Sequence, residues 1–381
     1  MFLTLTIPLE GGQAASEAAR SAVVPAFRNG FPAAPDFFPI GVWLQSPSNA
    51  AAFRVLGINT FVGLWQGPTE AQLRDLAASG MFVVAEQNEV GLRSPNAGII
   101  KAWMQSDEPD NAQPAAFGYG PCIPASSVAE RSRALKRRAA TRPVMINFGQ
   151  GVANPAWVGR GACTGDMAYY DTAIQGADIL SFDIYPAASD IAAVRGKLEY
   201  VARGVDELVR RAAPGQAVWA VLETTFIGSR QRVSALELRA EVWMALTHGA
   251  KGVLYFVHEW TGGFREDGIF RHPGIVEEVT RDNRLIASLA PVLNSKTVAG
   301  AVKVSTSTIS TMVKQYDKAM YVFCVAMDKA GSAARFETSL PSARVEVIGE
   351  NRTLAMANGA FADSFAGYGV HLYRIGLNAG R

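Results

Sequence analysis

The sequence is poor in the residues and patterns that mark several protein classes. Its 381 residues include only 3 cysteines and 4 histidines, and the histidines are too dispersed to form the spacing of a metal site. No apolar run reaches the roughly 18–20 residues that a membrane-spanning helix needs. The 36 basic and 34 acidic residues almost cancel. This balance gives no electrostatic reason to expect a nucleic acid or an anionic membrane as a partner.

Two further absences narrow the fold and the ligand. No Gly-x-Gly-x-x-Gly motif follows an early strand, so an open, doubly wound nucleotide-binding sheet lacks support. The predicted strand ends also lack the glycine-rich loops and lysines of a phosphate site. No cofactor and no metal are therefore expected, and a neutral ligand fits best. The sequence leaves the oligomeric state open.

The cysteines bear on the compartment. Cys122 and Cys163 both lie in loop-like contexts that we place on the same face of the fold, and we predict a disulfide between them; two free loop thiols are the alternative. Cys324 lies in an apolar run and is expected in the core. A disulfide favours a periplasmic or secreted protein. The apolar N-terminus has no basic region and is broken by Pro8, so it is a poor signal peptide.

After an irregular segment over 1–38, strand-like and helical runs alternate over 39–292. Several of the strand-like runs are apolar throughout, which is typical of parallel strands buried on both faces. Eight such units in roughly 255 residues predict a (β/α)₈ barrel. The predicted strands are 40–43, 59–65, 81–86, 99–106, 143–148, 178–185, 218–223 and 252–258.

Beyond Pro291 the pattern changes to alternating β-type runs separated by turn residues. This predicts a small C-terminal β-sandwich over 293–381, packed tightly on the barrel because no low-complexity linker precedes it. The clearest runs are 302–308, 320–326, 344–348 and 368–374.

Polar and aromatic residues gather at the predicted carboxyl ends of the barrel strands, where the active sites of barrel enzymes lie. Amides and acids can orient sugar hydroxyls, and flat rings can stack on sugar faces. For the amides, buried hydrogen-bonded side chains are the alternative. The candidate substrate contacts are Trp65, Gln87, Asp107, Asn147, Tyr185, His258 and Trp260.

Two segments carry the candidate catalytic acids. Lys101-Ala-Trp-Met-Gln-Ser-Asp-Glu-Pro-Asp110 brings the fourth strand to Asp107 and Glu108, and Ala217-Val-Trp-Ala-Val-Leu-Glu-Thr-Thr225 ends the seventh at Glu223. Cleavage of a glycosidic bond needs two carboxyl groups facing each other across that bond. Asp183, after the sixth strand, is expected to have a structural role beneath the site, and Glu259 is a rival to Glu223.

In these positions the sequence resembles clan A of the (β/α)₈ glycoside hydrolases over about 39–292. In that clan the acid/base follows the fourth strand, usually in an Asn-Glu pair, and the nucleophile follows the seventh. The resemblance implies Glu108 as acid/base, Glu223 as nucleophile and Tyr185 as an aromatic neighbour of the nucleophile. Asp107 departs from the usual Asn, and an ionised Asp cannot donate a hydrogen bond to the sugar 2-hydroxyl.

The resemblance implies a retaining double displacement on a poly- or oligosaccharide. Glu223 would attack the anomeric carbon, while Glu108 would first protonate the leaving oxygen and then activate water. A non-catalytic carbohydrate-binding protein on a degenerate barrel is the alternative, and a barrel lyase or another hydrolase is a third possibility. Sugar identity, linkage and endo or exo cleavage do not follow from the sequence.

Overall fold

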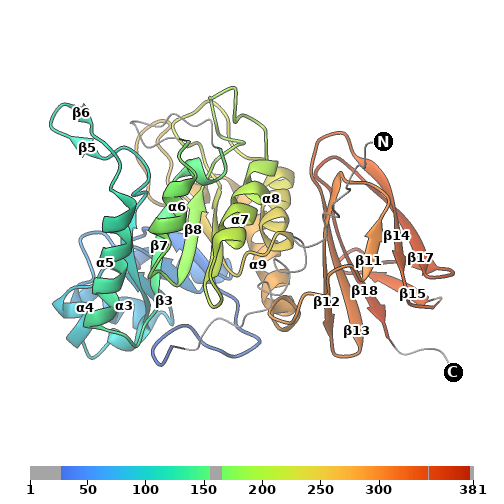
Figure 1. Cartoon of the computed structure of the whole chain (residues 1–381), viewed down its shortest axis with the longest axis horizontal. Helices are drawn as coiled ribbons and strands as arrows, with labels where there is room; N and C mark the ends of the chain where they lie inside the picture. Colours follow the sequence, from blue (N-terminus) through green and yellow to red (C-terminus); the bar gives the residue numbers. More distant parts are fainter. Residues whose placement is uncertain (1–26, 155–164, 342, 378–381) are drawn as a thin grey trace, which may run out of the picture.

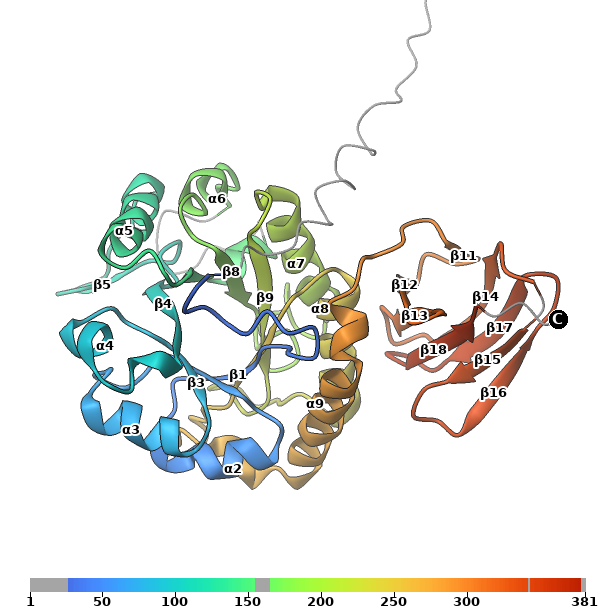
Figure 2. The ribbon, with the colours of Figure 1, turned by 90° about the horizontal axis from the view of Figure 1, so that it is seen from below.

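The computed structural model describes residues 27–154, 165–341 and 343–377. Within them, eight parallel strands close into a barrel in the order β1-β10-β9-β8-β7-β4-β3-β2. Figure 2 shows helices encircling these strands. The predicted (β/α)₈ architecture is therefore confirmed. The barrel strands are β1 Ile40–Trp43, β2 Thr60–Val62, β3 Phe82–Ala85, β4 Ile100–Asp107, β7 Val144–Phe148, β8 Ile179–Asp183, β9 Ala217–Glu223 and β10 Val253–Phe256.

The strands close because their side chains are apolar on both faces. Alternate residues such as Met145, Ile179, Trp219 and Leu254 fill the barrel interior. Their neighbours along each strand pack outward against the helices in a second, larger cluster. Burial on both faces explains why these strands read as continuous apolar runs rather than as alternating patterns.

Two of the surrounding helices begin at side chains that cap the first turn. Thr69 and Ser234 form capping boxes that start α3 and α8. The described α-helices are α2 Ala50–Val55, α3 Glu70–Ala78, α4 Glu89–Arg93, α5 Ala125–Arg138, α6 Ala168–Ala173, α7 Glu199–Arg211, α8 Ala235–Thr247 and α9 Pro273–Leu293. Short 3₁₀ turns are η1 Pro47–Asn49, η2 Ala97–Ile99, η3 Gln150–Val152 and η4 Gly268–Arg271.

The sequence predicts boundaries of the barrel at residues 38 and 292. The predicted irregular segment 1–38 lies mostly outside the described residues, and 27–39 contains turns and loop. The predicted domain boundary at 292 falls in the last turn of α9.

The C-terminal domain is the predicted β-sandwich. Its strands form a three-stranded sheet, β11-β14-β17, and a five-stranded sheet, β12-β13-β18-β15-β16. Alternate residues of both sheets meet in a separate apolar core. The strands are β11 Val302–Val304, β12 Ile309–Tyr316, β13 Ala319–Ala326, β14 Ser332–Thr338, β15 Ala343–Val347, β16 Arg352–Met356, β17 Ala360–Phe365 and β18 Val370–Gly376.

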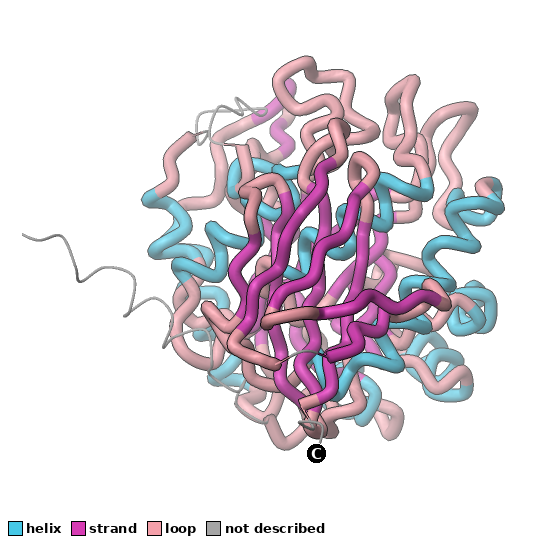
Figure 3. The backbone as a smooth tube through the Cα atoms, turned by 90° about the vertical axis from the view of Figure 1, so that its right-hand side faces the viewer, coloured by secondary structure: helices cyan, strands magenta, loops and turns pink. Residues whose placement is uncertain are grey.

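The two domains pack side by side, as Figure 1 shows, and the five-stranded sheet faces α8 and α9. Figure 3 views the molecule from the side of this sandwich. Trp243 of α8 stacks on Phe323 of β13 with ring centroids 5.7 Å apart. The Tyr368 hydroxyl donates to the carbonyl of Gly196 at 3.0 Å. Phe323 belongs to the same apolar cluster as the outer layer of the barrel, so the outer face of the five-stranded sheet shares a core with the barrel, beside the sandwich's own interior core.

Two of the three cysteines lie in the described part of the chain. Cys122 is disulfide-bonded, and Cys324 is a free, buried thiol. Cys163, its predicted partner, lies outside the described residues.

In the described ranges, no helix is both long and apolar enough to cross a membrane.

The shared core predicts that the domains depend on each other for stability. Phe323→Ala removes a fully buried ring, and such changes cost about 3–5 kcal/mol. Urea unfolding should therefore show a lower midpoint for the barrel as well as for the sandwich. Phe117→Ala is the matched control, because Phe117 is 99 % exposed and should change stability by less than about 0.5 kcal/mol. A barrel transition that Phe323→Ala leaves unchanged would contradict this expectation.

Candidate active site

A bulge in β4 aims Asp107 at the barrel mouth. Met104 packs inside the barrel, so strict alternation would place Ser106 inside and Asp107 outside. The register with β7 shifts between Met104 and Asp107, and Asp107 then pairs with Asn147. Bulges redirect side chains in this way and are frequent next to active sites.

Asn147 joins the carboxyl ends of β4 and β8. Its side-chain amide donates to Asp107 Oδ1 at 2.9 Å and to Asp183 Oδ1 at 3.2 Å. Its own oxygen accepts from the Ser181 hydroxyl at 2.7 Å. Because the two carboxylate oxygens share one nitrogen, they lie within about 6 Å of each other. Asn147 is buried, so it acts as a fixed bridge between two carboxylates.

Glu108 occupies an unusual backbone conformation directly after the bulge. Its φ of 39° lies in the left-handed region, which a side chain adopts at a cost and which is often found at functional sites. Its backbone N–H donates to the carbonyl of Asn147 at 2.9 Å, and its Oε2 accepts from Asn111 at 3.0 Å. Gly149 lies close by: a Cβ there would be 3.1 Å from Glu108 Oε1.

Asp110 is a buried acid beneath this turn. It accepts from the Gly149 backbone N–H at 2.9 Å and from the Tyr170 hydroxyl at 2.7 Å. These bonds fix the loop that carries Glu108. Asp107, Glu108, Asp110 and Asp183 are called the carboxyl cluster below. Sequence reasoning missed Asp110, although it ends the same Asp-Glu-Pro-Asp motif.

The three aspartates of the carboxyl cluster hold protons more tightly than free acids do. Solvent reaches Asp107, but protein atoms surround it on most sides, and this loss of hydration together with the charge of Glu108 raises the pKa of Asp107 to about 7. Burial raises the pKa of Asp110 to about 6. Burial, followed by the charges of Glu108 and Asp107, raises the pKa of Asp183 well above its usual value.

No basic side chain of the described ranges pairs with Asp107, Asp110 or Asp183. The Tyr185 hydroxyl instead hydrogen-bonds to Asp183. Asp183 and Tyr185 line a cavity of about 250 Å³ between the loops that follow β8 and β9. The predicted structural role of Asp183 therefore understates its position, since a small ligand can reach it.

Aromatic rings form a continuous platform at the same end of the barrel. His258 lies at its centre, with Trp65 parallel to it at 5.8 Å and Phe256 at 5.1 Å. Trp260 stacks on Phe256 at 5.7 Å, and Phe264 contacts Trp65. Trp65 is 40 % exposed and Trp260 44 %, so part of each ring remains available to a ligand. Tyr185 contacts Phe256 and connects this aromatic platform to the carboxyl cluster.

Two predicted substrate contacts are occupied by internal partners. Gln87 donates its amide to the Leu135 carbonyl of α5 at 3.0 Å. The His258 Nε2 lies 2.9 Å from the Leu44 carbonyl, and burial lowers the pKa of the imidazole. His258 thus supports the platform, and Gln87 contacts the helix layer.

Glu223 has a different environment from the carboxyl cluster. It is 0 % exposed, and its two oxygens accept the backbone N–H groups of Ala187 at 2.7 Å and Ala188 at 2.5 Å. It also lies next to Glu241, a buried acid of α8. Burial raises the pKa of both Glu223 and Glu241. Because burial and the neighbouring carboxylate both favour the neutral form of Glu241, this pair retains a proton.

The remaining acids at the mouth have structural partners. Glu259 pairs with Arg271 at 3.0 Å and with His272 at 2.5 Å. Glu266, which sequence reasoning missed, accepts from the Trp65 indole at 2.9 Å and from Asn49 at 3.1 Å. It therefore orients the platform. Across the described ranges, no three His, Cys, Asp or Glu side chains form a group that could hold a metal ion.

Comparisons with solved structures agree with this architecture. An α-amylase from Anoxybacillus superimposes with a TM-score of 0.56 at 11 % identity, covering 91 % of this chain and 99 % of that one. An α-amylase from Geobacillus thermoleovorans gives 0.55 at 10 %, with 91 % and 99 % coverage. A putative α-galactosidase from Bacteroides fragilis gives 0.54 at 11 %, with 89 % and 79 % coverage.

Similarity at this level of identity establishes the fold: a (β/α)₈ barrel with a C-terminal β domain. No protein-family model matches the chain, and no curated protein matches its sequence.

The raised pKa values predict how stability depends on pH. Asp107 is protonated more readily in the folded than in the unfolded protein, so its contribution to stability is complete below about pH 4 and is lost as pH rises through about 7. Asp107→Asn keeps the oxygen that accepts from Asn147 but cannot ionise. Urea unfolding at about pH 4.5 and about pH 7.5 should therefore show a smaller loss of stability in this variant than in the wild type.

The exposed Asp36→Asn serves as the control and should keep the wild-type dependence on pH. An Asp107→Asn protein that loses as much stability as the wild type over this range would contradict the raised pKa.

Proposed function

We propose that this protein is a glycoside hydrolase that cleaves a poly- or oligosaccharide with retention at the anomeric carbon. The observation that carries the proposal is the meeting of the carboxyl cluster and the aromatic platform at one barrel mouth. Paired carboxyl groups perform glycosidic cleavage, and aromatic rings offer flat faces to sugars. Solved structures with the same fold include an α-amylase and a putative α-galactosidase.

The sequence-based assignment pairs Glu108 with Glu223. Glu108 lies close enough to act electrostatically on Asp107, Asp110 and Asp183, which supports its place in the site but not a particular catalytic role. The surroundings of Glu223 oppose the nucleophile role. A nucleophile must be ionised and must reach the anomeric carbon, whereas Glu223 is buried beside Glu241 with both oxygens bonded to backbone amides.

The geometry favours a second pair, Asp107 and Asp183. Their bonds to the Asn147 nitrogen hold the two oxygens at most about 6 Å apart, a limit compatible with the roughly 5–5.5 Å typical of retaining enzymes. Both pKa values are raised: that of Asp107 to about 7 and that of Asp183 well above its usual value. Carboxyl pairs of this kind divide into an acid and a base. We assign Asp183 as the general acid and Asp107 as the nucleophile, with Glu108 holding their pKa values up.

Trapping the glycosyl-enzyme tests this function and its residues together. A panel of 2-fluoro glycosides with good leaving groups should inactivate the enzyme and add one sugar, which fragmentation mass spectrometry then locates. We expect the label on Asp107. A label on Glu223 would restore the two-glutamate assignment and overturn ours. Failure of every glycoside to turn over, with sugar binding retained, would replace the proposal by the non-catalytic carbohydrate-binding protein.

The role of Asp183 predicts a dependence on the leaving group. Asp183→Asn should lower kcat/KM by about 10²–10⁴-fold on substrates with poor leaving groups. The loss should be much smaller on activated aryl glycosides, because a good leaving group needs no proton. Glu223→Gln is the matched comparison: as a buried structural acid, it should lower stability rather than show this dependence. Equal losses of Asp183→Asn on both substrate types would contradict the acid role.

A further inference from the structure

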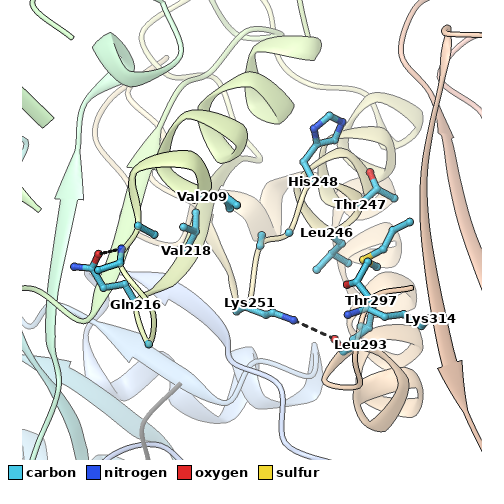
Figure 4. Close-up of a pocket in the computed structure, with 16 residues that line it drawn as sticks. Val209, Gln216, Val218, Leu246, Thr247, His248, Lys251, Leu293, Thr297 and Lys314 are labelled. Atoms are coloured by element: carbon cyan, nitrogen blue, oxygen red, sulfur yellow. Dashed lines mark hydrogen bonds between the residues drawn. The ribbon is translucent and has the colours of Figure 1, made fainter. Parts of the chain in front are cut away.

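A second cavity lies at the opposite end of the barrel, where the barrel meets the C-terminal domain. It has a volume of about 130 Å³, far more than the roughly 10–15 Å³ that a water molecule needs. The ends of α7, α8 and α9, the start of β9, the turn before β10, and β12 surround it. Figure 4 shows Lys251 and Lys314 reaching its wall from the two domains, with His248 and Thr297 nearby. Neither the carboxyl cluster nor the aromatic platform contributes to this cavity.

Two lysines line the cavity and contact each other. Lys314 of β12 is 1 % exposed and donates to the Ser295 carbonyl at 2.7 Å. Lys251, just before β10, points to the Leu293 carbonyl at 3.4 Å. The two amino groups are also close enough to hydrogen-bond, with protonated Lys251 donating to Lys314 when Lys314 is a neutral amine. Over the ranges that the structure describes, no carboxylate forms an ion pair with either of them.

This arrangement leaves positive charge uncompensated. Burial and then the charge of Lys251 lower the pKa of Lys314 to about 7, and burial lowers that of Lys251. The carbonyls after α9 offset part of the charge. Each ammonium group has three donors, and each has one carbonyl acceptor here. Asp206 does not compensate them, since its carboxylate bonds to His248 at 2.9 Å.

We propose that this cavity binds a compact oxyanion, such as phosphate, sulfate or a small carboxylate, between Lys251 and Lys314. Oxygen acceptors on one anion can satisfy donors from both lysines, and its charge removes their repulsion. The anion would contact the start of β10 in the barrel and β12 in the sandwich at once. Its binding would therefore stabilise the joined form of the two domains. This site is independent of the proposed glycosidase activity.

Thermal unfolding at constant ionic strength tests the site with phosphate, sulfate and acetate as separate probes. At least one anion should raise Tm of the wild type saturably, by about 2–4 °C at high occupancy, relative to chloride. Lys314→Met should abolish the saturable rise. The matched control Lys303→Met changes an exposed lysine of the same domain and should retain it. Which probe saturates at the lowest concentration identifies the anion class.

A rise that Lys314→Met shares with the wild type would overturn the proposal, because it would be a general salt effect. Should Lys314→Met fail to fold, calorimetric titration of the wild type decides alone. It should show one anion per chain, with unchanged affinity in Asp183→Asn. Absence of saturable binding by all three probes, or affinity lost in Asp183→Asn, would overturn the site.

Discussion

The candidate site depends on one irregularity, the bulge in β4 between Met104 and Asp107. Without this bulge, Asp107 would face the helix layer, and the side-chain nitrogen of Asn147 would have only Asp183 as an acceptor. With it, one buried amide holds the oxygens of two carboxylates. The same step in register sets Glu108 in a left-handed conformation, where its backbone bonds to Asn147. A single extra residue thus converts the end of a structural strand into the centre of the carboxyl cluster.

Charge is distributed unevenly along the barrel axis. Four acids crowd the carboxyl end, where like charge and burial raise the pKa values of Asp107, Asp110 and Asp183. Two lysines meet at the amino end, where burial lowers their pKa values. A neutral overall composition conceals both groupings, since 36 basic and 34 acidic residues cancel. Repulsion between like charges in each cluster destabilises the folded protein. Binding of a ligand or a proton relieves this repulsion and is the simplest explanation for the presence of both clusters.

Much of the fold could be predicted because buried segments appear in the sequence as apolar or periodic runs. All eight barrel strands follow apolar runs, and α5, α8 and α9 follow clear capping or periodic signals. In the sandwich, β13 is nearly all buried and was predictable, whereas β14 and β16 alternate with exposed, small or charged residues and leave little signal. The amphipathic run over 191–212 predicts one long helix, but α7 begins only at Glu199, and turns precede it. Ala187 and Ala188, whose N–H groups bind Glu223, lie in a bend before those turns.

The site was only partly predictable, and the reason is three-dimensional. Position along a strand predicts which residues reach the barrel mouth, and it identified Asp107, Glu108, Asn147, Trp65 and Trp260. It cannot predict partners: Glu223 fits the expected position in sequence, yet its carboxylate lies against Glu241 of α8, a helix residue that no motif marks. Asp183, expected beneath the site, instead lines a cavity and bonds to Asn147 and Tyr185. Since both acids end neighbouring strands, their difference comes from what surrounds each side chain. Glu223 is buried beside another carboxyl group and retains a proton. Asp183 instead borders a cavity, where a ligand can reach it and it can react.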